Sequence, residues 1–413
     1  MSNTKAQIGN RMETVTMKFI EDEFDVLFKT REPILLIGMP GVGKTEIIRS
    51  LVRKLINQNQ LPENGFFSVD FSQVPQEGIA MPYLDTSDPN EKVKRDIMSE
   101  LKQLASYLKE TEKEQSPAVF FIDEFTSAIQ DDQRTLMNFV NDGKLPNGDE
   151  LDNDRVFFVI AGNPSSEMPG YEDYDGATHP IENAVVTRGG TFFVVPDLDS
   201  WLDWGALTSS EKPEEYNLHP YLQAAIRNFR SLYMQTSEND IRLLNSRTGK
   251  KLSNYFYAAN EMKRTWRAET IKAFVGDEVG SKIASTIANY DKLVSIEELF
   301  GPDTNKKLNG PALTKFKKMD EYEKFYVLMT LVSNQSKIKF TKRNNVVKLK
   351  ALLEQGEPSN ESIAALSSLI YSTNKNDSKS NASGLLATKW LNDDEVDLQT
   401  MFLDLRKTQA QVH

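Results

Sequence analysis

The fold of this 413-residue chain is decided by one stretch of sequence, Gly38-Met39-Pro40-Gly41-Val42-Gly43-Lys44-Thr45. It follows the short apolar run 34–37 and fits the pattern G-x-x-x-x-G-K-[ST] at every position. Glycines at these places let backbone N–H groups point inward at phosphate oxygens, which a Cβ atom would obstruct. Lys44 supplies a positive charge for phosphate groups, and the Thr45 hydroxyl is a ligand for Mg²⁺. We therefore expect residues 38–45 to bind the phosphates of a nucleotide together with Mg²⁺.

Further apolar runs of the same kind follow this motif, as expected for strands that are buried on both faces. They are residues 66–70, 118–122, 156–161 and 192–195, and helical patterns separate most of them, at 44–57, 93–114 and 131–141, after a leading helix at 16–30. Strands that alternate with helices indicate a parallel sheet covered on both faces. The sequence therefore predicts an α/β domain over residues 1–198, with a five-stranded parallel sheet between helices.

Beyond about residue 200 the hydrophobic pattern changes, and helical periodicity dominates. These patterns cover residues 220–234, 251–274, 280–290, 320–333, 346–355, 361–371 and 395–407. The segment 372–384 is polar and poor in apolar residues, so we expect a loop there.

Composition excludes several classes of site. The chain has no Cys, so it has no disulfides, thiol nucleophiles or Cys-ligated metals, and its three His are far apart in the sequence. Its 60 acidic residues against 49 Lys and Arg give a net charge of -11, unlike a protein that coats nucleic acid. No apolar run approaches the length that crosses a bilayer, and the start does not resemble a signal peptide. We expect a soluble, cytoplasmic protein without membrane contact.

Two of the predicted strands end in polar residues that suit hydrolysis. The run 118–122 leads into Asp123-Glu124, which places two carboxylates at the carboxyl edge of the sheet. Asp123 would hold Mg²⁺, and Glu124 would orient and deprotonate the attacking water. The run 156–161 leads into Asn163, whose amide would hold that water and touch the terminal phosphate. The structural alternatives are an acidic helix N-terminus for the carboxylates and a simple Asn-Pro turn for Asn163.

Arg188 lies shortly before the last predicted strand and has two interpretations. It would reach the γ-phosphate held by a neighbouring subunit and stabilise the charge of the transition state. Alternatively it is a surface cation at a helix end, where it suits the helix dipole. The residues by themselves leave both interpretations open.

Taken in order, these motifs resemble an AAA+ ATPase, with Walker A at 38–45, Walker B at 119–124, sensor 1 at Asn163 and an arginine finger at Arg188. Within that superfamily the chain is most similar to the MoxR-like, dynein-related branch found in phages and bacteria. The similarity covers about residues 16–260 and is carried by Val74-Pro75-Gln76-Glu77-Gly78-Ile79-Ala80-Met81-Pro82, by Pro196-Asp197-Leu198-Asp199-Ser200-Trp201-Leu202-Asp203-Trp204, by His219-Pro220 and by Leu243-Leu244-Asn245-Ser246-Arg247.

The resemblance implies a ring, usually a hexamer, with ATP and Mg²⁺ bound between subunits and Arg188 acting on the neighbour's ATP. It divides the chain into a nucleotide-binding core at 1–198, a helical lid at 199–300 and a C-terminal helical extension at 301–413. Arg247 would be the sensor 2 contact to ATP, although the family usually has Thr-Pro-Arg-Ser-Trp where this chain has Asn245-Ser246-Arg247-Thr248-Gly249.

The resemblance also implies protein partners. Residues 74–82 would be a loop facing a central channel, and residues 143–155 would be the hairpin before sensor 1. Members of the branch often work with a protein that carries a von Willebrand A domain, and they assemble or remodel other proteins. We therefore expect a chaperone-like ATPase.

Two other functions remain open. A nucleic-acid motor or loader would use the basic run Lys337, Lys339, Lys342, Arg343, Lys348 and Lys350, which also fits a solvated protein face. A nucleotide-gated structural component would need ATP binding but not its turnover. The net acidic charge makes nucleic acid the weaker expectation.

Overall fold

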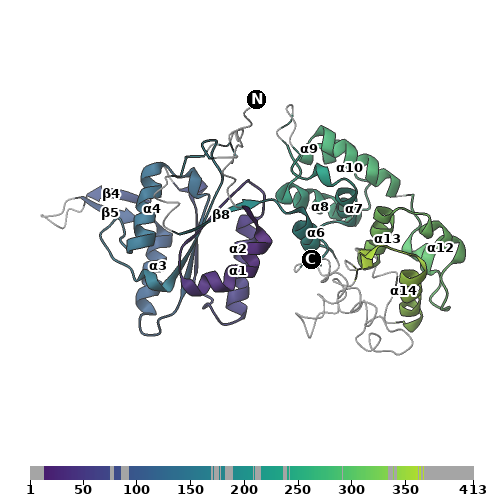
Figure 1. Cartoon of the computed structure of the whole chain (residues 1–413), viewed down its shortest axis with the longest axis horizontal. Coiled ribbons are helices and arrows are strands. Elements are labelled where there is room, and N and C mark those ends of the chain that lie inside the picture. Colours follow the sequence, from purple (N-terminus) through teal and green to yellow (C-terminus); the bar gives the residue numbers. More distant parts are fainter. Residues whose placement is uncertain are drawn as a thin grey trace, which may run out of the picture. The chain divides into compact units, whose positions relative to one another are not determined.

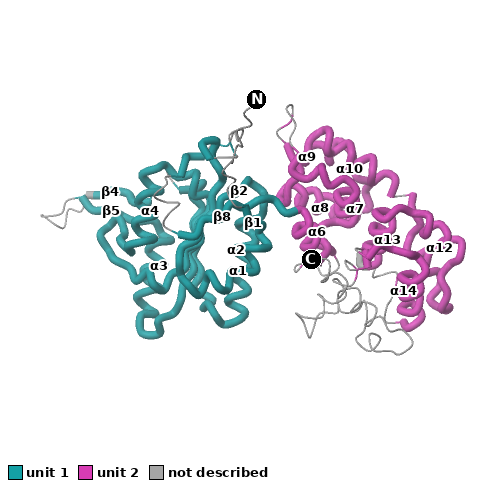
Figure 2. The backbone as a smooth tube through the Cα atoms, viewed as in Figure 1, with its two compact units in different colours: residues 1–197 teal, residues 198–413 magenta. Residues whose placement is uncertain are grey.

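The computed structural model describes residues 14–74, 79–84, 93–168, 171, 176, 178–181, 189–207, 209, 215–235, 240, 242–290, 292–333, 338, 342–360, 362–363 and 366. The chain divides into two compact units, residues 1–197 and residues 198–413 (Figure 2). We call them unit 1 and unit 2 and describe each by itself. The predicted three-part division of the chain at 198 and 300 stays a prediction.

Unit 1 is built on a sheet of six parallel strands. All five predicted strands are confirmed, and a short edge strand that was not predicted, β1, pairs with β8 in parallel. The strands are β1 (Thr14–Thr16), β2 (Ile34–Gly38), β3 (Phe66–Asp70), β6 (Ala118–Asp123), β7 (Val156–Gly162) and β8 (Gly190–Val195), in the spatial order β1-β8-β2-β7-β6-β3. This order puts β7 between β2 and β6, so the segments that follow these three strands emerge side by side at the carboxyl edge.

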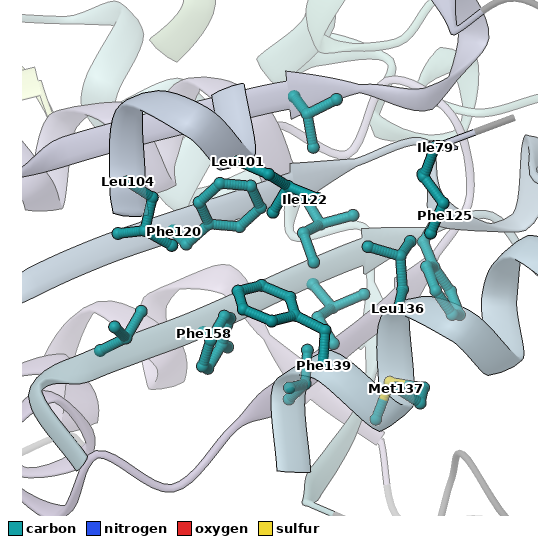
Figure 3. Packing of buried hydrophobic residues seen from close by; sticks show 14 of the residues in the cluster. Ile79, Leu101, Leu104, Phe120, Ile122, Phe125, Leu136, Met137, Phe139 and Phe158 are labelled. Atoms are coloured by element: carbon teal, nitrogen blue, oxygen red, sulfur yellow. The ribbon is translucent and has the colours of Figure 1, made fainter. Parts of the chain in front are cut away.

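Helices cover both faces of this sheet (Figure 1). They are α1 (Met17–Thr30), α2 (Lys44–Asn57), α3 (Ser99–Glu110) and α4 (Gln130–Asp142). Because side chains alternate along a strand, neighbouring residues enter different cores. Phe121 packs in the cluster that contains residues of α1 and α2. Phe120 instead packs with Phe139 of α4 and Phe158 of β7, ring edge to ring face (Figure 3).

The predicted helix over 93–114 is wrong in its first part. Residues Val93–Ile97 form strand β5, which pairs antiparallel with β4 (Ala80–Leu84), and helix α3 begins only at Ser99. Val93 and Ile97 lie on the same face of β5, but only Ile97 is buried in the core, whereas Val93 is exposed at the far end of the strand. The three residues between them are charged, so the stretch carries no clear strand pattern. The two strands form a hairpin that projects from the body of unit 1 (Figure 1).

Unit 2 consists of helices that bury two hydrophobic clusters. The predicted single helix over 251–274 is instead two helices, α8 and α9, separated at residues 262–267, where Lys263 has a positive φ of 53°. The helices of this unit are α6 (Leu198–Gly205), α7 (Pro220–Asn228), α8 (Ser246–Glu261), α9 (Ala268–Val275), α10 (Asp277–Tyr290), α11 (Ile296–Phe300), α12 (Gly310–Lys317), α13 (Glu321–Ser333) and α14 (Arg343–Gln355). Among the described residues, no helix has the length and apolar character needed to cross a membrane.

The polar segment predicted at 372–384 and the helix predicted at 395–407 lie outside the described residues.

Candidate functional site

The turn between β2 and α2 requires glycine at three positions. Gly41 and Gly43 have φ angles of 83° and 98°, in the region that residues with a Cβ rarely adopt. A Cβ on Gly38 would lie 2.6 Å from the carbonyl oxygen of Val194 on the neighbouring strand. The glycines of the motif therefore fix a loop whose backbone turns directly into the N-terminus of α2 at Lys44.

Lys44 is almost fully enclosed, with 8% of its surface exposed. Its ammonium group donates to the carbonyl oxygen of Gly38, to that of Met39 at 3.3 Å and to Asn163 Oδ1 at 3.1 Å. Burying an ammonium is costly unless acceptors surround it, and here three protein oxygens do so. This places a desolvated positive charge at the mouth of the loop, where a phosphate group would be held.

Thr45 and Asp123 come together across the carboxyl edge of the sheet. The Thr45 hydroxyl donates to Asp123 Oδ2 at 2.7 Å, and the other carboxylate oxygen accepts from the Glu124 N–H at 3.0 Å. A hydroxyl and a carboxylate are the hard oxygen donors that Mg²⁺ prefers, with water and substrate phosphates completing its shell. Within the described part of the chain, no three His, Cys, Asp or Glu side chains gather as an all-protein metal cage. The donor set therefore fits Mg²⁺ bound together with a nucleotide.

Glu124 and Asn163 also meet at this edge. Asn163 Nδ2 donates to Glu124 Oε2 at 2.7 Å. The orientation of the amide follows from chemistry, because an ammonium can only donate and a carboxylate only accepts. Asn163 thus bridges Lys44 and Glu124, as expected from the position of β7 between β2 and β6. The sequence analysis predicted that these side chains would be close, and the structure brings Lys44, Thr45, Asp123, Glu124 and Asn163 together.

The backbone of Glu124 is unusual for a residue with a side chain. Its φ and ψ angles, 52° and 35°, lie in the left-handed region. The turn is closed by the Ser127 N–H, which donates to the Glu124 carbonyl oxygen at 2.8 Å. Strained backbone of this kind persists where the surroundings hold it, and it is concentrated at functional sites.

Thr126, which no sequence motif indicated, is fully buried beside these residues. Its hydroxyl accepts from the Asn163 N–H at 2.9 Å, and its carbonyl oxygen accepts from the His179 N–H at 2.8 Å. A Cβ on Gly162 would lie 2.8 Å from the Thr126 methyl group. The available signal was the pair of hydroxyl residues Thr126-Ser127 between apolar neighbours, directly after the carboxylate pair.

Of the two predicted arginines, only Arg247 is among the described residues. Arg188 lies outside the described residues. Arg247 is an exposed residue in the first turn of α8 in unit 2. Two residues that flank Arg247 have a structural role, because Asn245 and Thr248 form a reciprocal capping box at the start of α8, with bonds of 2.9 Å in each direction.

The two predicted partner loops are described only in part. Of 74–82, residues 75–78 lie outside the described residues and Ala80–Pro82 belong to β4. In 143–155, an antiparallel bridge joins Lys144 to Glu150, and the Leu145 N–H donates to the Asp149 carbonyl oxygen at 2.8 Å. A short hairpin is therefore present there.

Comparison with protein families identifies an AAA domain in unit 1. Residues 34–170 match the model of the AAA family, the ATPase family associated with various cellular activities. The match includes the whole phosphate loop, the carboxylate pair and Asn163. A search of curated proteins found no match.

The solved structures that match this chain share little sequence with it. NtrX from Brucella abortus in complex with ADP is 12% identical over 84% of this chain and 70% of its own, with a TM-score of 0.35. The ORC2 protein from Aeropyrum pernix, in ADPNP and ADP complexes, is 13% identical over 77% of this chain and 83% of its own, with a TM-score of 0.33. Similarity at this level carries no conclusion about activity.

Proposed function

We propose that this chain is a Mg²⁺-dependent ATPase that works as an oligomer and hydrolyses ATP to ADP and phosphate. One observation carries the proposal: within the AAA match, the buried Lys44 ammonium, the Asn163 amide and the Glu124 carboxylate form one hydrogen-bonded series at the edge of the sheet. A buried cation beside a carboxylate and an amide is what phosphoryl transfer to water requires, namely positioning and charge stabilisation.

Each side chain has a distinct task in this proposal. Backbone N–H groups of residues 38–43, except that of Pro40, which has none, and the Lys44 ammonium bind the phosphates. Thr45 and Asp123 would hold Mg²⁺, which neutralises charge on the phosphate oxygens. Lys44 would exchange its bonds to the loop carbonyls for bonds to phosphate oxygens, which are stronger because both partners are charged.

Glu124 is the general base in this proposal. Its carboxylate accepts a proton from the attacking water, and the Asn163 amide orients that water toward the γ-phosphate. Since Asn163 contacts both Lys44 and Glu124, one amide connects the phosphate-binding cation with the base. Binding and hydrolysis would thus share one polar network.

We further propose that the active form is a ring, with six subunits as the expected number, in which Arg188 reaches the ATP of the adjacent subunit. A cation supplied in trans stabilises the charge of the transition state. Arg247, exposed on α8, would be a second cationic contact to ATP. An isolated subunit would then hydrolyse ATP poorly.

We infer that the ATPase belongs to the MoxR-like branch and remodels protein complexes in the cytoplasm, with a von Willebrand A domain protein as a candidate partner. The β4–β5 hairpin supports a protein partner, since it exposes Met81, Tyr83 and Val93 at 52%, 47% and 64%. Exposed apolar and aromatic side chains on a projecting element are typical of protein-binding surfaces.

The basic run gives less support to a nucleic-acid motor. Lys342 pairs with Asp303 at 2.6 Å, and Lys348 is fully buried and donates to the Pro302 carbonyl oxygen at 2.7 Å. Lys350 lies 3.8 Å from Glu354. Lys348 is thus buried, and Lys342 and Lys350 already face carboxylates of the same chain, which weakens their attraction for nucleic-acid phosphates.

The oligomeric mechanism is tested by mixing two inactive variants. Lys44→Ala disables the subunit's own phosphate site, and Arg188→Ala disables what it gives to its neighbour. In mixed rings, some interfaces pair the intact Lys44 of an Arg188→Ala subunit with the intact Arg188 of a Lys44→Ala subunit. These interfaces regain activity, so the ATPase activity of the mixture should exceed that of either variant alone. A mixture with no recovery, formed from variants that still assemble, would refute action in trans.

The class of partner is tested with the wild-type protein. Single-stranded DNA, duplex DNA and RNA should leave the rate of ATP hydrolysis unchanged. Stimulation by any of them would favour the motor or loader. The structural-component alternative predicts that Glu124→Gln retains biological function while Lys44→Ala loses it.

A further inference from the structure

We propose that Thr126 is a positioning residue, which holds the Asn163 amide and the Glu124 carboxylate in the relative position that hydrolysis requires. This inference rests on the ATPase activity proposed above and concerns a residue outside the groups proposed to bind ATP, Mg²⁺ and the attacking water. Its hydroxyl accepts from the Asn163 N–H at 2.9 Å, while the Asn163 side chain bonds to Glu124 at 2.7 Å. Thr126 therefore closes a loop of contacts between the ends of β6 and β7.

The Asn163 backbone is fixed from two sides. Pro164 follows it and restricts its backbone to extended conformations. The Thr126 hydroxyl satisfies its N–H, which belongs to a residue only 8% exposed and would otherwise be buried without an acceptor. With its backbone held in this way, Asn163 presents its amide in one direction, between Lys44 and Glu124.

Thr126 is itself held by three contacts. Its carbonyl oxygen accepts from the His179 N–H at 2.8 Å, and its methyl group fills the space above Gly162, where a Cβ would lie 2.8 Å away. It also belongs to the turn that Ser127 closes on the left-handed Glu124. The hydroxyl thus connects the turn that carries the base with the strand end that carries the amide.

The contacts predict a defect in turnover and not in binding. Before ATP binds, the carbonyl oxygens of Gly38 and Met39 hold Lys44 in the phosphate loop independently of Asn163, so a shift of Asn163 leaves the phosphate site formed. The Asn163–Glu124 contact depends on the relative position of two backbones, and hydrolysis is sensitive to small displacements at the reacting groups.

The test replaces the hydroxyl and the methyl group separately. Thr126→Val keeps the shape and removes the acceptor, and we expect kcat to fall by about 10-fold to 100-fold, with the Kd for a fluorescent ATP analogue unchanged. Thr126→Ser keeps the acceptor and should restore most of the turnover. Ser127→Ala removes a hydroxyl from the same turn but keeps the N–H that bonds to Glu124, so it should behave as the wild type.

Several outcomes would overturn the inference. One is wild-type kcat in Thr126→Val, and another is an equal loss in Thr126→Ser, which would assign the effect to the methyl group. A parallel loss of kcat and of ATP affinity would mean a purely structural role. If Thr126→Val does not fold, the smaller Thr126→Ala is tested by the same comparison of kcat with the Kd for the ATP analogue. Wild-type protein that lacks ATPase activity would instead refute the proposed function, which keeps the two failures distinct.

Discussion

Both units of this molecule bury a lysine and a side-chain amide, but they use them differently. In unit 1, Lys44 and Asn163 bond to each other at 3.1 Å, although 119 positions separate them in the sequence. In unit 2, Lys348 donates to the backbone carbonyl of Pro302, and Gln223 donates to those of Gly205 and Leu218 at 3.0 and 2.7 Å. Burial of a polar side chain is thus common to both units.

The difference lies in what the buried groups contact. Gln223 and Lys348 satisfy backbone carbonyls and so tie chain segments to helices, which stabilises the fold. Lys44, Asn163 and Glu124 contact one another at the end of a sheet, where substrates of parallel α/β folds bind. Convergence of side chains, and not burial alone, marks the candidate site.

The largest expected effect compares the two buried lysines. Lys44→Ala should weaken ATP binding by about 100-fold or more, because it removes charge-assisted bonds to the phosphates. Lys348→Met should keep the ATP affinity and lower only thermal stability. Titration with a fluorescent ATP analogue and thermal melting measure the two quantities. Loss of ATP affinity in Lys348→Met would break the comparison.

The two buried amides should differ in a similar way. Asn163→Ala should lower kcat by about 100-fold, as expected for removal of a preorganised polar contact in the transition state. Gln223→Leu should leave kcat unchanged and reduce the free energy of unfolding by about 1–3 kcal/mol, since it orphans carbonyl groups. Steady-state ATPase assays and urea titrations separate the effects. Equal kcat in Asn163→Ala and wild type would remove Asn163 from the mechanism.

The smallest effect concerns His219, a buried residue of unit 2. Burial lowers the pKa of His219 from 6.5 to about 3, so the unfolded chain binds more protons between these values. Stability of unit 2 should therefore be full above pH 6.5 and fall as the pH drops, by about 2 kcal/mol at pH 5. All four Trp lie in the sequence of unit 2, so their fluorescence during urea unfolding reports on it.

A variant isolates this titration. His219 caps α7 by accepting from the Tyr221 N–H at 3.2 Å, and Asn is a good cap that does not titrate. His219→Asn should therefore flatten the loss of stability between pH 7 and pH 5. An unchanged pH dependence in the variant would assign the effect to other groups. ATP affinity at fixed pH should not respond to the substitution.

Much of unit 1 could be predicted from the sequence because its defining features are formed by contiguous residues. Buried parallel strands are continuous apolar runs, and the phosphate loop is a contiguous motif, so both are visible along the chain. The edge strand β1 has three residues, too few for a pattern. Strand β5 is largely charged and exposed and is followed directly by helix α3, so no strand pattern marks it. Thr126 was missed because its partner Asn163 is brought to it by the pairing of β6 with β7.

The helices of unit 2 were predicted less accurately. Their patterns show which face is apolar, but the break between α8 and α9 depends on a local positive φ at Lys263 that the pattern does not reveal. The capping box of Asn245 and Thr248 at the start of α8 also depends on side-chain hydrogen bonds that the helical pattern does not reveal. Local backbone geometry therefore determines where α8 begins and ends.

The most direct test of the site is the identity of the nucleotide held by Glu124→Gln after incubation with Mg²⁺ and ATP. The amide keeps an oxygen that can accept from Asn163 but loses the basicity needed to take a proton from water. Asp131→Asn, which alters an exposed carboxylate on α4, is the control and should release ADP as the wild type does. We predict that Glu124→Gln retains intact ATP when the bound nucleotide is extracted and separated by chromatography. Recovery of ADP at the parental rate would contradict the assignment of this cluster as the hydrolytic centre.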